Sequence, residues 1–135
     1  MGEVRGVETV DMLQALNTGH AGSMSTGHGN STKDMLYRLE TMVLMGMEIP
    51  AVAVRRQLAS GIDLLIHLGR LRDKRRVLLE ITEIAHCTDG EIILNPIYRF
   101  EETGLDENGK VLGSFIKVGS LLHKEKLHMA GFEDD

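Results

Sequence analysis

Two turn-forming dipeptides in the second half of the chain place the strongest constraint on its fold. Asp89-Gly90 lies between strand-like segments at about 75–86 and 91–100. Asn108-Gly109 separates the second segment and its loop from a third segment at 111–118. Such dipeptides favour tight hairpin turns, because Gly, Asn and Asp adopt positive φ at little cost. The second half of the chain therefore predicts a meander of antiparallel strands.

The segments that flank this meander predict two further elements and one irregularity. The apolar run at 62–68 predicts a buried strand. Residues 120–131 carry a rough amphipathic pattern and predict a terminal helix. Pro96 cannot donate a backbone hydrogen bond, so its strand is expected at a sheet edge or at a bulge.

The first half of the chain has the periodicity of helices. An apolar face at i, i+3, i+4 and i+7 indicates a first helix, which Gly19 is expected to end. This face consists of Thr9, Met12, Leu13 and Leu16. Ser31 predicts the cap of a second helix, with Asp34 as its capping-box partner. The buried stripe of that helix is expected to contain Met35, Leu39, Met42 and Val43, with Lys33, Arg38 and Glu40 facing away. Pro50 predicts the first turn of a third helix that runs to about Ser60.

The composition argues against several classes of protein. The chain has 135 residues, a net charge of −5 and no apolar run long enough to span a bilayer. An acidic balance argues against a dedicated binder of nucleic acid or anionic membranes, since such proteins carry a basic surface. The single cysteine, Cys87, rules out an internal disulfide framework and suits a reducing cytoplasm. No zinc-ligand spacing is present in the sequence, so no metal site is expected.

Two short strings near the start of the chain carry the candidate chemistry. Residues 2–8 read Gly-Glu-Val-Arg-Gly-Val-Glu, and residues 25–31 read Ser-Thr-Gly-His-Gly-Asn-Ser. A P-loop ATPase needs a carboxylate at the end of a core strand to orient the attacking water and support the Mg²⁺ shell, and Glu3 fits that role. An imidazole beside a γ-phosphate can donate a hydrogen bond to developing charge, and His28 fits this second role. Outside such a site, Glu3 would be an exposed acid and His28 a histidine in a turn.

Together, the two strings resemble adjacent active-site elements of the secretion ATPases, the motors of type II and type IV secretion, conjugal transfer and pilus assembly. The first string resembles the end of the Walker B strand, and the second resembles the His box. The resemblance runs from Glu3 to about Gly131. It is strongest to the tight-adherence pilus branch, whose Arg-Phe-Glu and Val-Leu-Gly stretches match residues 99–101 and 111–113. Gly29 departs from the family, which more often has alanine at that position.

This resemblance implies an α/β fold, the C-terminal half of a RecA-like P-loop NTPase domain, in which helices are followed by the antiparallel meander. Residues 1–135 would form a partial domain with the Walker B end, the His box and the C-terminal strands and helix, but without the Walker A half. Glu3 and His28 would be its catalytic residues. ATP and Mg²⁺ would be cofactors of the full-length protein, whereas the fragment alone is expected to be inactive and to hold neither tightly.

The resemblance also implies an assembly. The family works as a hexameric ring with nucleotide between protomers, docked from the cytoplasmic side on inner-membrane secretion or pilus platform proteins. Arg5, His20, Arg55 and Arg56 are candidates for contacts with nucleotide or with a neighbouring subunit. Each of the three arginines could equally form an ordinary surface ion pair.

Other interpretations stay open for the chain and for two of its segments. The chain could be a free-standing docking module that keeps the ATPase fold without its activity. The five basic residues between Arg70 and Arg76 could grip nucleic acid or form a solvated turn between strands. The methionines at positions 35, 42, 45 and 47 could form an adaptable docking surface or pack in the core. A half-domain would expose an apolar sheet edge, so the fragment is expected to self-associate.

Overall fold

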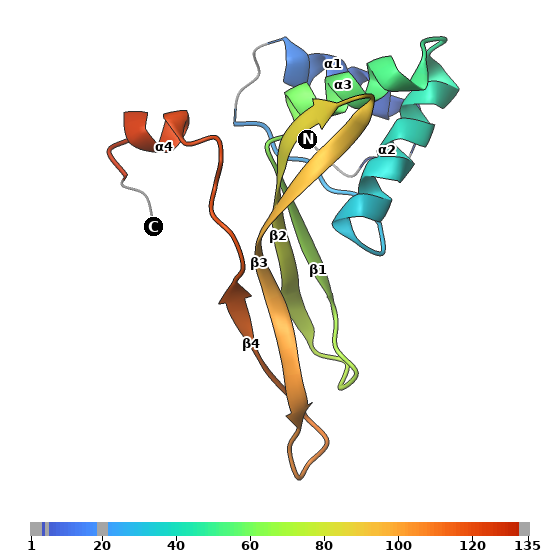
Figure 1. Ribbon diagram of the computed structural model, residues 1–135. Helices are drawn as coiled ribbons and strands as arrows, with labels where there is room; N and C mark the ends of the chain where they lie inside the picture. Colours follow the sequence, from blue (N-terminus) through green and yellow to red (C-terminus); the bar gives the residue numbers. More distant parts are fainter. Residues whose placement is uncertain (1–3, 5, 19–21, 133–135) are drawn as a thin grey trace. The chain divides into compact units, whose positions relative to one another are not determined.

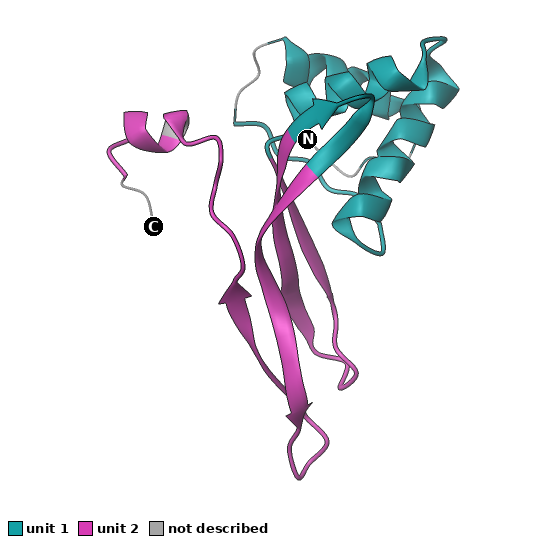
Figure 2. Ribbon diagram, viewed as in Figure 1, with its two compact units in different colours: residues 1–63, 86–93 teal, residues 64–85, 94–135 magenta. Residues whose placement is uncertain are grey.

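The chain forms two compact units, shown in Figure 2. The computed structural model describes residues 4, 6–18 and 22–132. Unit 1 consists of residues 1–63 and 86–93, and unit 2 consists of residues 64–85 and 94–135. Two long strands, β2 (Arg76–Thr88) and β3 (Glu91–Leu105), contribute residues to both units.

Unit 1 contains the three predicted helices, α1 (Glu8–Asn17), α2 (Thr32–Gly46) and α3 (Ala51–Gly61), shown in Figure 1. One apolar cluster forms its core, and Ile92 from the β2–β3 hairpin packs against it. The cluster consists of Val4, Met12, Leu13, Leu39, Val43, Val54 and Leu58. Pro50 is the N-cap of α3 and not part of its first turn, and Gly19, the expected end of α1, lies outside the described residues. None of the helices in the described ranges is long and apolar enough to cross a membrane.

The predicted meander is present as a four-stranded sheet in the order β1-β2-β3-β4. Its edge strands are β1 (Leu64–Arg70) and β4 (Val111–Lys117), and the pairs β1–β2 and β3–β4 are antiparallel. Asp89 and Gly90 link β2 to β3 with φ values of 52° and 79°. Positive φ at both central residues is typical of a type I′ turn, as the dipeptide predicted.

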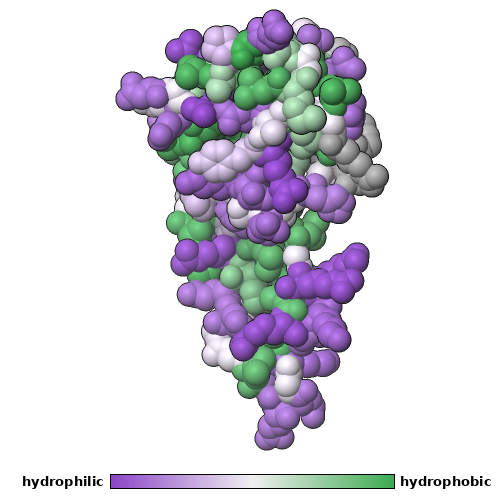
Figure 3. All heavy atoms as spheres, turned by 90° about the vertical axis from the view of Figure 1, so that its right-hand side faces the viewer, coloured by the Kyte–Doolittle hydropathy of each residue, from purple (hydrophilic) through white to green (hydrophobic). Residues whose placement is uncertain are grey.

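The prediction that β1 is a buried strand is wrong. Leu64, Ile66 and Leu68 alternate with half-buried residues and are 45%, 59% and 66% exposed. β1 lies at an edge of the sheet, and one of its two faces is left open. Apolar composition alone does not distinguish a strand covered on both faces from one covered on a single face. Figure 3 shows such apolar side chains, in green, at the surface among hydrophilic ones in purple.

The prediction that the strand of Pro96 lies at a sheet edge or a bulge is wrong. β3 is an internal strand, so the proline does not lie on an edge strand. The ladder between β3 and β4 starts at Tyr98, two residues further along. Pro96 therefore lies just outside the part of β3 that pairs with β4, and its missing N–H does not interrupt that ladder.

The terminal helix α4 (Glu125–Met129) is much shorter than the predicted helix at 120–131. Residues 118–123, called the strap below, are not helical. The backbone N–H groups of Leu122 and His123 donate to the carboxylate of Glu83 at 2.8 and 3.0 Å. Because this carboxylate, which is in β2, satisfies the amides that a helix would have used, the helix begins only after the strap.

Candidate functional site

Val4 of the first string and Thr26 of the second string lie side by side in unit 1. The backbone N–H of Val4 donates to the carbonyl oxygen of Thr26 at 2.7 Å, and Thr26 forms a single β-bridge. Val4 is 5% exposed and belongs to the core of unit 1, so apolar burial anchors one side of this contact. The tertiary structure thus brings the first string against the loop that contains His28.

Two glycines hold the loop of His28 close to α2. A Cβ atom on Gly27 would lie 2.3 Å from Cε of Met35 and 3.5 Å from Cγ2 of Val4. A Cβ atom on Gly29 would lie 3.1 Å from Cβ of Met35 and 3.2 Å from its backbone nitrogen. The alanine that the family more often carries at position 29 would therefore require α2 to give way slightly. His28, between the two glycines, is exposed, so a ligand can reach its imidazole.

The first turn of α2 follows this loop directly and is closed by side chains. Oγ of Ser31 accepts a hydrogen bond from the N–H of Asp34 at 3.0 Å, which confirms the predicted cap. Oδ2 of Asp34 accepts from the N–H of Asn30 and from Nε of Arg38, both at 2.9 Å. The N–H of Asn30 is the main cause that lowers the pKa of Asp34; burial opposes it, and Arg38 adds to the lowering. The chain's own carboxylate thus occupies the positive end of the helix, and His28 is one of several exposed polar residues in the loop before it.

Arg55 forms an ion pair and a hydrogen bond within unit 1. Its Nε donates to Oε1 of Glu40 at 2.6 Å, and its Nη1 donates to the carbonyl oxygen of Gly90 at 3.0 Å. Glu40 is only 9% exposed, so the expectation that it faces away from the core is wrong. One guanidinium group therefore connects α2, α3 and the turn of the β2–β3 hairpin. Arg56, the next residue, is exposed.

The other candidate site residues lie outside the described residues. These are Glu3, Arg5 and His20, and their roles stay predictions. Among the residues that are described, no group of three or more His, Cys, Asp or Glu side chains is arranged to hold a metal ion. The described part of the site thus offers an exposed imidazole on a tightly packed loop, which can donate a hydrogen bond or carry a proton.

Two carboxylates with buried side chains, which the sequence analysis did not single out, organise the rest of the chain. Glu83 is 2% exposed and accepts hydrogen bonds from the strap and, at 3.0 Å, from Nδ2 of Asn95. Asp73 joins two turns of unit 2 through Val111. Asp73 also pairs with Arg75 two positions away, but the other partners of these two acids are 12 to 40 positions away, so no local pattern identifies their roles. The basic segment that contains Asp73 is the turn between β1 and β2, as one of its two interpretations predicted.

A protein-family model matches most of the chain. The model of the family described as "Type II/IV secretion system protein" matches residues 1–96. The chain is 43% identical over 81 residues to a putative conjugal transfer protein of Mycobacterium tuberculosis, which is 60% of this chain and 23% of that protein. It is 34% identical over 90 residues to the probable conjugal transfer protein TrbB of Sinorhizobium fredii, with coverage of 67% and 26%.

A solved structure shares the fold. The crystal structure of the VirB11 ATPase from the Brucella suis type IV secretion system, in complex with sulphate, matches with a TM-score of 0.56 and 30% identity. The match covers 59% of this chain and 25% of that one. The chain thus spans about a quarter of the length of the proteins that it resembles.

Proposed function

Because the chain belongs to the family of type II/IV secretion system proteins, we propose that it is part of an ATP-hydrolysing motor for protein secretion, pilus assembly or conjugal transfer. Its α/β fold, with helices followed by an antiparallel meander, agrees with that of a secretion ATPase. The relatives named above are conjugal transfer and type IV secretion proteins, which favours the conjugal-transfer branch of the family.

The contact between Val4 and Thr26 carries the proposal for the site. An ATPase of this kind needs the carboxylate at the end of its Walker B strand near the group that senses the γ-phosphate. The hydrogen bond between these two residues joins the neighbour of Glu3 to the loop of His28. In this proposal Glu3 orients water and supports Mg²⁺, and His28 donates a hydrogen bond to the γ-phosphate of ATP.

The motor would act as a hexameric ring with nucleotide between protomers, on the cytoplasmic side of inner-membrane platform proteins. Arg5, His20, Arg55 and Arg56 are the candidates for contacts with nucleotide or with the neighbouring subunit. Arg56 is exposed, whereas Arg55 already donates to Glu40 and Gly90 within its own unit. We therefore place Arg56 ahead of Arg55 as the residue that crosses between subunits.

The test is ATP hydrolysis by the protein extended upstream in its native reading frame to include a G-x-x-x-x-G-K-[ST] loop. Glu3→Gln should abolish hydrolysis and retain nucleotide binding, and His28→Gln should lower the turnover at least about a hundredfold. Lys33→Gln, an exposed change on α2, is the control. Unchanged turnover in Glu3→Gln removes Glu3 from the mechanism.

The chain of 135 residues alone should not hydrolyse ATP, because the backbone amides and lysine of a phosphate-binding loop are not in its sequence. Robust turnover by this chain would contradict the proposal. A stop codon directly ahead of Met1 would instead favour the free-standing docking module.

A further inference from the structure

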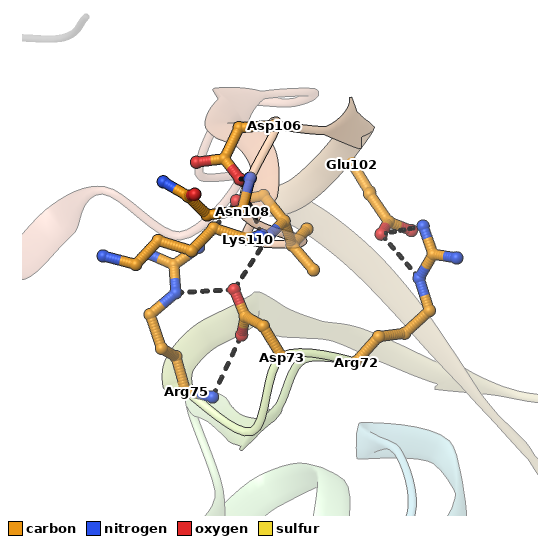
Figure 4. Close-up of polar contacts among 8 residues, drawn as sticks. Arg72, Asp73, Arg75, Glu102, Asp106, Asn108 and Lys110 are labelled. Carbon is orange, nitrogen blue, oxygen red and sulfur yellow. Dashed lines mark hydrogen bonds and ion pairs between the residues drawn. The ribbon is translucent and has the colours of Figure 1, made fainter.

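Two turns of unit 2 are joined by hydrogen bonds, which run from an ion pair in one turn to the backbone of a single residue that follows the other turn (Figure 4). The turn at 71–75 connects β1 to β2, and the turn at 106–110 connects β3 to β4. Oδ2 of Asp73 accepts from the N–H of Val111 at 2.8 Å, while Nη2 of Arg75 donates to the carbonyl oxygen of Val111 at 2.6 Å. We call these two turns and the strand ends beside them the turn pair.

Most acidic groups of the turn pair already form hydrogen bonds or ion pairs within the chain. Asp73 also accepts from Nε of Arg75 at 2.8 Å. Oδ1 of Asp106 accepts from the N–H groups of Asn108 and Lys110 at 2.9 and 2.8 Å. The carboxylate of Glu102, on β3, accepts from Nε of Arg72 at 2.9 Å. Glu107 is the exposed acid left in these turns.

Four cations of the turn pair have no acidic partner among the described residues. They are Arg70, Lys74, Arg76 and Lys110, and all four are exposed. The strand register places Arg70 directly opposite Arg76, so two guanidinium groups share one face of the sheet. Like charges in this arrangement destabilise a strand pair. The local fold thus carries an unfavourable charge pair that an anionic ligand would relieve.

We propose that the turn pair is a docking site for an acidic segment of a partner protein. A carboxylate between Arg70 and Arg76 would accept hydrogen bonds from both guanidinium groups, which match carboxylate geometry well. Leu68 shares the face of Arg70 two residues earlier and is 66% exposed, and Leu112, two residues after Lys110, is 47% exposed. The site therefore fits a segment in which acidic residues lie close to apolar ones.

Two other polyanions fit the site less well. Single-stranded nucleic acid binds by stacking on exposed aromatic rings, whereas Tyr98 and Phe115 on the neighbouring strands stack on each other, with ring centroids 5.3 Å apart. The net charge of −5 also opposes long polyanions and anionic bilayers. A short acidic segment, by contrast, would contact only the positively charged turn pair and not the acidic remainder of the surface.

The binding test uses the chain of 135 residues and a fluorescein-labelled peptide in which aspartate alternates with serine and leucine. The double change Arg70→Glu with Arg76→Glu should weaken binding at least about tenfold. Arg70→Lys with Arg76→Lys should weaken it less, because lysine keeps the charge and loses only the planar guanidinium geometry. Lys33→Glu with Arg38→Glu alters the net charge equally in unit 1 and should leave binding unchanged. Binding should also weaken as NaCl rises from about 50 to about 300 mM.

Equal loss in the unit 1 control, or no binding of the peptide, would overturn the proposal. Tighter binding of duplex DNA or of phosphatidylglycerol vesicles than of the peptide would also overturn it, in favour of those partners. Failure of this test leaves the proposed ATPase function untouched, because none of the residues changed at the turn pair is a candidate for catalysis.

A stability measurement separates a binding role from a structural one. Arg76→Glu places an acid opposite Arg70, so it should raise the melting temperature while it weakens peptide binding. A lower melting temperature in this variant would show that the arginine pair supports the hairpin itself, and would contradict the proposal.

Discussion

The carboxylate of Asp73 and the backbone N–H of Val111 form a hydrogen bond of 2.8 Å across 38 positions of the sequence. The side chain of Asp73 is 8% exposed, and Val111 is 3% exposed. This contact ties the turn after β1 to the first residue of β4, so it joins the two hairpins of unit 2 at their turns.

Asp73→Asn should remove an acid-dependent part of the stability of unit 2. The N–H of Val111 is the largest cause that lowers the pKa of Asp73, from 3.8 to about 2; burial opposes it, and Arg75 adds to the lowering. A lowered folded-state pKa stabilises the fold above about pH 4, and this stabilisation is lost as the pH falls towards 2. Acid titration followed by near-ultraviolet circular dichroism of Tyr98 and Phe115 measures it. Glu107→Gln is the control, and an unchanged acid transition in Asp73→Asn would refute the assignment.

Glu83→Gln should release the strap at 118–123. Burial alone would raise the pKa of Glu83, but hydrogen bonds from Leu122, Asn95 and His123 together lower it. The ionised form is therefore the one that stabilises the fold, and the effect fades as the pH falls below the ordinary value of 4.5. We expect a loss of about 2–3 kcal/mol at neutral pH, because an amide nitrogen cannot accept from a backbone N–H. Hydrogen exchange at Leu122 and His123 should accelerate, but not in the exposed control Glu101→Gln.

Arg55→Ala should destabilise unit 1 by about 1–3 kcal/mol, since it leaves the carboxylate of Glu40 nearly buried without its partner. The expected loss is below that of a fully buried pair because the Arg55 side chain is 33% exposed. The double change with Glu40→Ala should recover part of it. Arg56→Ala should alter the free energy of unfolding by less than about 0.5 kcal/mol. Urea denaturation of the four proteins distinguishes these effects, and equal losses in Arg55→Ala and Arg56→Ala would contradict the ion pair.

Gly113→Ala should destabilise the pair of strands β3 and β4. A Cβ atom at this position would lie 2.4 Å from the carbonyl oxygen of Glu101 and 2.6 Å from Cζ of Phe100. The backbone oxygen cannot move without distorting the ladder, so we expect a loss of about 1–3 kcal/mol. Thermal unfolding measures it, with the exposed neighbour Ser114→Ala as control. A melting temperature equal to that of the control would show that the strands accommodate the methyl group.

Elements defined by local signals were predictable. The cap at Ser31 and the type I′ turn at Asp89-Gly90 depend on a few consecutive residues, and both are present. The buried face of α1 followed from its periodicity. The strap was not predictable in this way, because Glu83, which holds it, is about forty positions away.

The candidate site shows the same division. The two strings were identified from the sequence because their residue types and order are distinctive, whereas their contact through Val4 and Thr26 exists only in the folded chain. Arg55 and Arg56 were equivalent in the sequence. The fold separated them, since it placed Glu40 and Gly90 around the first and left the second exposed.

The sequence by itself determined the order of helices and strands, the two hairpin turns and the family resemblance, since each depends on residues close together in the chain. Tertiary structure alone decided which distant groups surround the buried acids. Asp73, Glu83 and Glu40 find their partners through packing between distant segments, and the energy of a charge depends on its surroundings rather than on its neighbours in sequence.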